Sequence, residues 1–261
     1  MAKSGQARVL TPEQQKDLFI SISNNRHPEK NTAIMQISFK LGLRAQEIAL
    51  LEIKEIAYLG SQNNSTQREF KLLEVMSLPA SYTKGANALN RSQAKYERKT
   101  ISFKKETFDQ VVQQITALAK AGAKIDPSNF YPPLTQHKGK SRDLPLVDNE
   151  LRKALVTYLT LRLERDPTAT PSSPLFLTQK GGAYSPNTLQ EHMALMLRGW
   201  AGIEKSTSHS GRRSLITNII HKQKKSVKIA QKIAGHISPS TTILYEEPPE
   251  EAIGEALSNL D

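Results

Sequence analysis

Signals for the start and the end of helices recur along the chain, and they constrain its fold more than any other feature. Thr11-Pro12-Glu13-Gln14 combines a capping threonine, a proline at the first helical position and a glutamine that closes a capping box. Gly42 can end a helix over residues 31–41, and Arg44 then opens another. Further helix starts are expected at Asp148, Ser185-Pro186 and Ser238-Pro239. We therefore predict a mainly α fold with a small antiparallel β-sheet.

Only a few short segments have the character of strands. Residues 72–78 predict one strand, and residues 137–146 predict a basic hairpin with Gly139 at its turn. Leu175-Phe176-Leu177, followed by Gly181-Gly182, predicts a third strand and a turn. In contrast, apolar residues from Phe108 to Leu118 recur at helical spacing. Strands are thus expected to be a minor part of the fold.

The charge of the chain is positive and unevenly distributed. Its 261 residues include 36 Lys and Arg against 25 Asp and Glu, for a formal net charge of +11. Residues 246–261 carry no Lys or Arg but six acidic groups, which are Glu246, Glu247, Glu250, Glu251, Glu255 and Asp261. The rest of the chain is therefore more basic than the net charge suggests. Such a body favours a polyanionic partner, because neutralising phosphates releases condensed counterions.

Several classes of protein are excluded by what the sequence lacks. There is no cysteine, so disulfides, zinc–thiolate sites and cysteine nucleophiles are excluded together. The first residues have no apolar signal core, and no apolar run is long enough to span a bilayer. We expect a cytoplasmic protein, associated with the nucleoid if its partner is DNA.

Residues capable of chemistry on a phosphodiester concentrate in the last third of the chain. His209 and Arg212 are three positions apart at a predicted helix start, so they share a face. Gly235 is expected to end a helix in the left-handed conformation, with His236 directly after it, and Tyr245 follows across the next turn. Upstream, Arg44 lies at another helix start.

Taken in order, these motifs resemble the tyrosine recombinase (phage integrase) family. The matching features are Gly42-Leu43-Arg44-x-x-Glu47, His209-x-x-Arg212, and Gly235-His236 followed by Tyr245. The segment from Lys138 to Arg142, leading into Leu144-Pro145-Leu146, resembles the strand pair that carries the family's catalytic lysine.

The resemblance implies a site-specific DNA recombinase of the small, catalytic-domain-only type. Such an enzyme cleaves and rejoins DNA through a 3′-phosphotyrosyl intermediate in integration, excision or inversion. Double-stranded DNA is the implied partner, with a homotetramer on synapsed DNA. Cofactors, metals, membranes and small-molecule substrates are not expected. The implied catalytic residues are Arg44, Lys138, His209, Arg212, His236 and Tyr245.

This residue set suits phosphoryl transfer without a metal ion. The transition state carries extra negative charge on the non-bridging phosphate oxygens, which Arg44 and Arg212 can neutralise with forked donors. Removing one preorganised donor of this kind typically costs roughly 3–4 kcal/mol. The resemblance assigns Tyr245 as the nucleophile and Lys138 as the acid that protonates the departing 5′ oxygen. No Walker-type phosphate-binding loop is present.

The spacing between the motifs predicts an insertion and a separate tail. We expect a single catalytic domain over residues 1–245, with an inserted basic segment from about 60 to 130, and an acidic tail over 246–261. The tail either docks on a neighbouring protomer or packs on its own body. Lys84 is an alternative to Lys138 as the catalytic lysine. Candidate DNA contacts are Lys84, Arg91, Lys95, Arg98, Lys99, Lys140, Arg142 and Arg213.

Each residue also has a structural interpretation. Arg44 and Glu47 have the i, i+3 spacing of a helix-surface ion pair, His209 could be a capping histidine, and Tyr245 could be a half-buried ring. For the whole chain, two further functions share much of this pattern. One is DNA relaxation of the type IB topoisomerase kind, and the other is a DNA-binding regulator whose catalytic site has decayed.

Overall fold

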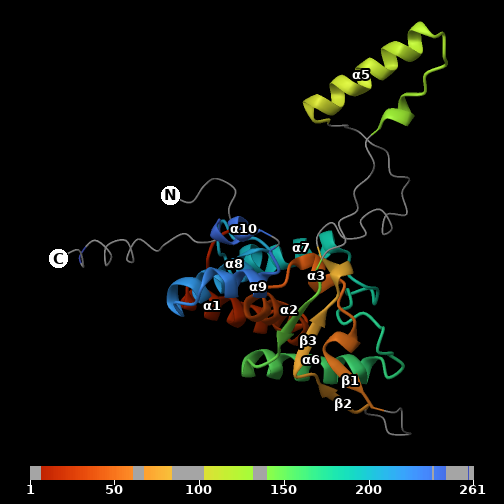
Figure 1. Ribbon diagram of the computed structural model, residues 1–261. Coiled ribbons are helices and arrows are strands. Elements are labelled where there is room, and N and C mark those ends of the chain that lie inside the picture. The colour runs from red at the N-terminus through yellow and green to blue at the C-terminus, as the bar shows by residue number, and fades with distance from the viewer. Residues whose placement is uncertain are drawn as a thin grey trace. The chain divides into compact units, whose positions relative to one another are not determined.

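Helices cover most of the described chain, as predicted from the capping signals. The computed structural model describes residues 7–60, 68–83, 103–131, 140–236, 238–244 and 258. The chain forms two units, one of residues 1–84 and 139–261 and one of residues 85–138 (Figure 1). The first is called the main unit below and the second the inserted unit.

The N-terminal helices of the main unit begin and end where their capping residues dictate. α1 spans Pro12–Ser23, and Thr11 and Gln14 form the predicted capping box. α2 spans Pro28–Leu41 and ends at Gly42 with φ of 64°. It begins three residues earlier than predicted, because Pro28 occupies the first helical turn. α3 spans Ala45–Ala49 and has Arg44 as its N-cap.

α2 lies at the centre of the main unit. It packs against α1, against α6 (Asn149–Arg165) and against α8 (Ser210–Thr217), so helices from both ends of the chain lie side by side (Figure 1). α2 and α8 approach each other very closely at Gly211 of α8, where an added Cβ would collide with Ser38 Oγ of α2. Only glycine fits there without displacing α2.

The remaining helices of the main unit follow α6. α7 and α8 are each continued by a π-helical segment, and α9 ends at Gly235 with φ of 65°, as predicted. The elements are α7 (Pro186–Ala194), η4 (Leu195–Trp200), η5 (Asn218–Lys222), α9 (Val227–Ala234) and α10 (Pro239–Ile243).

Two short antiparallel strand pairs complete the main unit. β1 (Ala57–Leu59) pairs with β2 (Phe70–Leu72), and η1 (Ile53–Glu55) precedes them. β3 (Val75–Leu78) pairs with β4 (Arg142–Pro145), with Leu78 opposite Arg142. η2 (Ala80–Tyr82) follows β3. The fold class, mainly α with small antiparallel sheets, is confirmed.

Two strand predictions need correction. The single strand over residues 72–78 is two strands, because the chain breaks at Leu73 and Glu74 to pair with different partners. Leu73 N–H donates to the Ile56 carbonyl, whereas the Glu74 carbonyl accepts from Leu146 N–H. The strand within residues 137–146 exists as β4, but its partner is β3, not a local hairpin strand. Residues 137–139 lie outside the described part.

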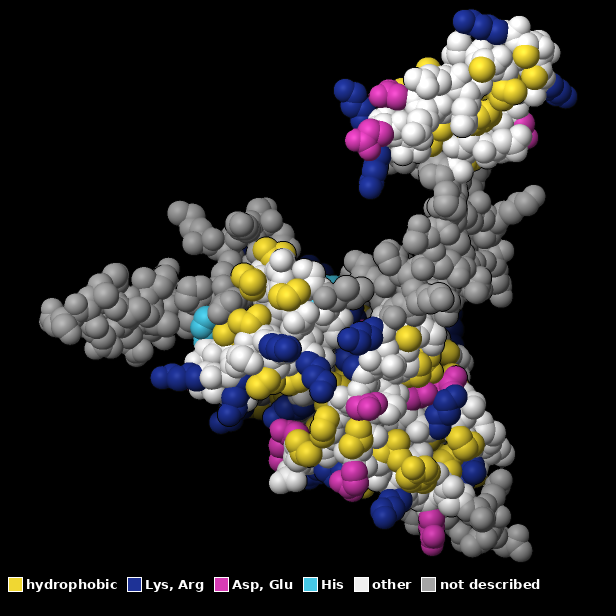
Figure 2. Space-filling model, viewed as in Figure 1, with side chains coloured by type: hydrophobic (Ala, Val, Ile, Leu, Met, Phe, Trp, Pro, Cys, Tyr) yellow, Lys and Arg dark blue, Asp and Glu magenta, His cyan; other side chains and the backbone are white. Residues whose placement is uncertain are grey.

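The inserted unit contains α5 (Lys105–Lys120) and η3 (Pro127–Phe130). α5 confirms the helix predicted from the spacing of Phe108 to Leu118. None of its residues is buried, and its apolar side chains form a row on the surface (Figure 2). None of the described helices in either unit is both long enough and apolar enough to cross a membrane.

Candidate phosphate-binding site

One buried carboxylate, that of Glu47 in α3, holds two arginines at the edge of the main unit. Arg142, on β4, donates from Nη1 to Glu47 Oε1 at 3.1 Å and from Nη2 to Oε2 at 2.9 Å. Arg44 donates its backbone N–H to Glu47 Oε2 at 2.8 Å and its Nη1 to Oε1 at 3.1 Å. The Glu47 side chain is fully buried, whereas that of Arg44 is 20% exposed. Arg44 is thus held at its backbone and at one guanidinium nitrogen, while its side chain stays partly exposed.

The charges around Glu47 keep it ionised despite its burial. Burial alone would raise the pKa of Glu47, but the hydrogen bonds and charge of Arg142, together with Arg44, lower it below its ordinary value. One carboxylate then faces two guanidinium groups. Among the described residues, Arg44 and Arg142 make ion pairs with Glu47 alone. Two positive charges therefore share one negative charge, and this group of three residues has a net positive charge.

Arg212, in α8, is fully buried at the meeting point of three chain segments. Its Nη1 donates to the Gly42 carbonyl and its Nη2 to the Ala234 carbonyl, each at 2.5 Å. These two carbonyls are at the ends of α2 and α9, where helices leave carbonyl oxygens without intrahelical partners. Arg212 thereby fixes the turns that carry Arg44 and His236.

Gly235 brings the end of α9 against β4. An added Cβ would lie 2.5 Å from Arg142 Nη1, and φ of 65° is a left-handed conformation that disfavours side chains. The following residue, His236, is buried, and its Nδ1 lies 2.9 Å from Thr242 Oγ1 in α10. Gly235 of the predicted Gly-His pair therefore lies against Arg142.

His236 is held neutral by its surroundings. Burial lowers its pKa most, and the charges of Arg212, Arg44 and Arg142 lower it further, to about 3, whereas Glu47 opposes them. Arg212 donates to the Ala234 carbonyl and Gly235 lies against Arg142, so these two arginines approach the chain directly before His236. A neutral imidazole can donate one hydrogen bond and accept another, which suits contact with a phosphate oxygen.

His209 and Arg213, both in the predicted motif around Arg212, differ in exposure. His209 is exposed at the N-cap of α8, and its N–H donates to Thr207 Oγ1 at 3.2 Å. Arg213 is buried and donates to the Ala7 carbonyl at 2.9 Å. Its proposed DNA contact stays a prediction, and the contact seen here ties α8 to the N-terminal segment.

Several predicted site residues are not in the described part. Tyr245, Lys138 and Lys84 lie outside it, as do the candidate DNA contacts Arg91, Lys95, Arg98 and Lys99. Lys140 is described and exposed. Arg142, predicted as a DNA contact, is buried and engaged with Glu47; a role at the DNA stays a prediction for it. Of the six predicted catalytic residues, the described chain brings Arg44, Arg212 and His236 together.

Sequence reasoning missed the central position of Glu47. Its i, i+3 spacing to Arg44 indicated an ion pair on a helix surface, but the second partner, Arg142, lies 95 residues away in sequence. A buried charge needs a partner, and an apolar flank around Glu47, with Ile48 and Leu51 nearby, was a signal of burial. In the described part, no three His, Asp or Glu side chains are grouped as a metal site would require.

The chain is similar to known proteins over part of its sequence. The model of the family described as "Phage integrase family" matches residues 134–251. "Tyrosine recombinase XerC" of Methylobacterium sp. (strain 4-46) is 35% identical over 108 residues, which are 41% of this chain and 32% of the relative. The protein of that name from Methylobacterium nodulans is 34% identical over 107 residues, 41% and 31% of the two chains. The alignments thus span about a third of each relative.

Solved structures show the same fold over nearly the whole chain. The crystal structure of XerA recombinase superposes with a TM-score of 0.59 and 18% identity, covering 99% of this chain and 65% of that one. The Tn1549 transposon integrase, in complex with transposon right end DNA, gives 0.56 and 16%, covering 100% and 68%. XerH bound to a palindromic difH substrate gives 0.53 and 17%, covering 96% and 52%. The family resemblance seen in the motifs is confirmed.

Proposed function

We propose that the chain, whose residues 134–251 match the model of the phage integrase family, is a site-specific DNA recombinase. The observation that carries the proposal is the arginine cluster: Arg44 and Arg142 share the Glu47 carboxylate, and buried Arg212 and neutral His236 lie at the helix ends beside them. Excess positive charge at a partly buried site fits an anion, and a phosphodiester is the anion that this family's reaction uses.

In the proposed reaction, Arg44 and Arg212 neutralise the charge that develops on the non-bridging oxygens. Their donors are held in place before the reaction, which is the most effective form of electrostatic stabilisation. His236 donates a further hydrogen bond to the phosphate. Arg142 is the positioning residue of the set, because it holds Glu47, which in turn orients Arg44.

Tyr245 is the proposed nucleophile. Its phenolic oxygen bonds to phosphorus as the bond to the 5′ oxygen breaks, which gives a 3′-phosphotyrosyl link and a free 5′ hydroxyl. Lys138, or Lys84 in its place, gives the proton to the departing 5′ oxygen, and His209 assists proton movement at the tyrosine. The reverse attack by a 5′ hydroxyl reseals the strand without ATP, because the phosphotyrosyl bond retains the energy of the ester.

The partner and the assembly follow from this reaction. XerH and the Tn1549 integrase are DNA complexes in their solved structures, and we extend DNA binding to this chain, whose net charge is +11. Exchange between two duplexes needs four active sites, so we propose a homotetramer on synapsed DNA, located in the nucleoid. We also propose that residues 1–245 are one catalytic domain with an insertion at about 60–130, and that residues 246–261 are an acidic tail that docks on a neighbouring protomer or packs on its own body.

Trapping of a covalent complex tests the proposed function. The full chain is incubated in EDTA with nicked suicide substrates from the flanking DNA, so that the cleaved strand cannot be resealed. A DNA-shifted band that survives denaturation is expected, and Tyr245→Phe should abolish it. Tyr58→Phe is the matched control, because Tyr58 is 70% exposed on β1 and belongs to none of the motifs, so the covalent band of this variant should persist.

Three results would contradict the proposal. Specific DNA binding with no covalent band on any substrate would indicate a regulator with a decayed site. A band that persists in Tyr245→Phe would assign the nucleophile to another residue. Relaxation of supercoiled plasmid without strand exchange would indicate the type IB activity.

A further inference from the structure

Lys30, in the first turns of α2, is a buried ammonium group with no carboxylate partner in the described chain. It is 8% exposed, and its Nζ donates to the Leu177 carbonyl at 2.9 Å. The same Nζ lies 5.5 Å from the centre of the Tyr184 ring. None of the ion pairs between described residues includes Lys30. Buried charges are usually paired, so this arrangement has room for an anion.

Further cationic side chains surround Lys30. Burial and the charge of Arg165 lower the pKa of Lys30. Burial, followed by the charges of Lys30, Arg165 and Arg26, lowers the pKa of His27, although Glu29 opposes this effect. The positive groups therefore disfavour one another, and a bound anion would relieve that repulsion.

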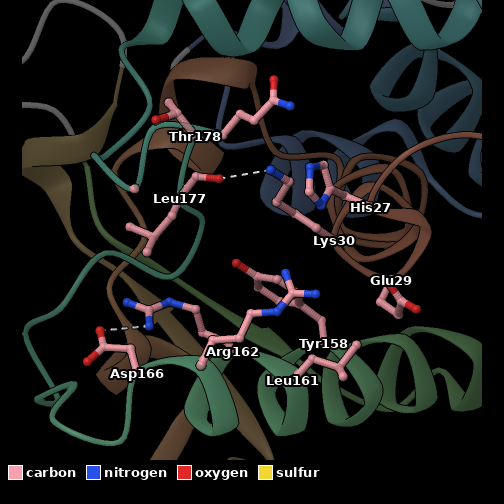
Figure 3. A pocket seen from close by; sticks show the side chains of 12 residues that line it. His27, Glu29, Lys30, Tyr158, Leu161, Arg162, Asp166, Leu177 and Thr178 are labelled. Atoms are coloured by element: carbon pink, nitrogen blue, oxygen red, sulfur yellow. Dashed lines mark hydrogen bonds and ion pairs between the residues drawn. The ribbon is translucent and has the colours of Figure 1, made fainter.

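A pocket of about 230 Å³ opens beside Lys30. Figure 3 shows Lys30 from α2 and His27, the N-cap of α2, on one side of it and Tyr158 and Arg162 from α6 on the other. Arg162 is 6% exposed, donates from Nη1 to Asp166 at 2.8 Å, and has a buried Nε with no hydrogen-bond partner. Asp166 occupies one guanidinium edge, and Glu29 is the other acidic residue of the lining.

An adjoining pocket of about 450 Å³ shares Lys30 and His27 with the first. Its walls include Arg26 and Lys180 together with the rings of Tyr184, His192 and Trp200. The Tyr184 hydroxyl lies 2.8 Å from His192 Nδ1, and the Trp200 ring meets His192 edge-on at 6.0 Å. The lining of this pocket is therefore partly cationic and partly aromatic.

We propose that these adjoining pockets bind a small ligand through its phosphate or carboxylate group, whose oxygens accept hydrogen bonds from Lys30 and Arg165. The start of α2 adds to the positive potential, because its N-cap, His27, makes no side-chain capping bond. The site is distinct from the arginine cluster. Lys30 and Gly42 are twelve residues apart on α2, which is about 18 Å at 1.5 Å per residue.

The single tryptophan of the chain provides the assay, because Trp200 lies in the pocket wall. The full chain is titrated with inorganic phosphate and with succinate while Trp200 fluorescence is recorded, and sodium chloride at equal ionic strength is the reference. A saturable change with either probe supports the site, and the probe that binds more tightly identifies the chemical class of the ligand. A change that chloride reproduces, or no saturable change with either probe, would overturn the proposal.

Two variants test the assigned donors. Lys30→Met removes the ammonium while keeping the side-chain length, and the probe should bind about tenfold more weakly or worse, since bonds to charged groups contribute that much. Arg165→Gln, at an exposed position, should weaken binding without threatening the fold. Lys228→Met, exposed on α9, is the control, and Arg44→Ala should also leave the titration unchanged. If Lys30→Met and Arg165→Gln both bind the probe as tightly as the wild type, the fluorescence change comes from binding at another site, and the proposal is wrong.

Discussion

Glu47 is the residue on which the arginine cluster depends. It accepts hydrogen bonds from the side chains of Arg44 and Arg142 and from the backbone of Arg44. Its full burial makes these bonds strong, because water does not compete for them. The same burial makes the loss of the charge expensive, since two guanidinium groups would remain without a counter-ion. The sequence indicated the pair with Arg44 through local spacing, whereas Arg142 becomes a neighbour only through the fold.

Replacement of Glu47 by glutamine should lower the free energy of unfolding by about 3 kcal/mol, as is typical when one partner of a buried ion pair is removed. Urea unfolding of the full chain measures the change. Glu74→Gln is the control, because Glu74 is 78% exposed in its pair with Arg152 and should matter by less than about 0.5 kcal/mol. Equal effects of the two changes would contradict the buried role.

Acidification should reduce the difference in the free energy of unfolding between the wild type and Glu47→Gln. The pKa of Glu47 in the folded chain lies below its ordinary value of 4.5. The stabilising contribution of the Glu47 carboxylate is therefore complete above pH 4.5. It is lost as the pH falls through the lower pKa of the folded chain. Unfolding curves of the wild type and Glu47→Gln should converge below pH 4.5.

His236 should remain neutral across the physiological range. Its pKa in the folded chain is about 3, because of burial and the charges of Arg212, Arg44 and Arg142, against an ordinary value of 6.5. The unfolded chain binds the proton first, so this residue lowers stability as the pH falls from 6.5 toward 3. In NMR, its ring C2 proton should not titrate between pH 8 and pH 5, whereas a midpoint near 6.5 would contradict the buried geometry.

At the scale of elements, the boundaries that could be predicted are those set by local chemistry. Thr11, Asp148 and Ser185 cap the helices as predicted, because a side chain three residues from its target needs no tertiary contact. The partner of β4 could not be predicted in this way. β3 and β4 are separated by more than sixty residues, and alternation along a strand gives its faces but not its neighbour.

Gly235 is the C-cap of α9 and lies against Arg142. Alanine at this position should therefore lower the free energy of unfolding by more than the left-handed backbone alone explains. Gly202 has nearly the same φ, 63° against 65°, but an added Cβ there meets nothing within 4 Å. Gly202→Ala should therefore cost about 1 kcal/mol for the left-handed backbone. Gly235→Ala should cost about 1–3 kcal/mol more, because its Cβ collides with Arg142. Urea unfolding of both variants measures the difference, and equal losses would show that Arg142 moves aside freely.

At the scale of the whole molecule, the inserted unit lies in sequence between two strands that pair directly. β3 ends at Leu78 and β4 begins at Arg142, opposite each other in the register. The inserted unit, residues 85–138, is compact by itself. Sequence spacing indicated an insertion from about 60 to 130, which remains a proposal. Composition could not give its limits, because basic and polar residues continue on both sides of them.

Removal of residues 85–138, with a Gly-Ser-Gly-Ser link in their place, should leave the main unit folded. Shortening the connection between β3 and β4 reduces the entropy cost of closing it, for a gain of about 1 kcal/mol. In calorimetry, the unfolding event of the main unit should persist in the shortened chain, because none of the described residues of the inserted unit is buried. Failure of the shortened chain to fold would mean that the inserted unit supplies part of the main core.

The basic run within the inserted unit should set the salt dependence of DNA binding. If Arg91, Lys95, Arg98 and Lys99 contact phosphates, replacing all four by alanine should reduce the slope of log affinity against log salt by about 0.9 for each phosphate that is no longer neutralised. A second variant with Lys104, Lys105, Lys120 and Lys124 replaced removes equal charge from the same part of the chain. The affinity of both variants for DNA is measured at several salt concentrations, on a specific site and on random DNA.

Because phosphate contacts carry no sequence information, the first variant should bind both DNAs more weakly and to the same extent. An equal loss of affinity in the second variant would mean that total charge, and not a defined contact surface, governs binding.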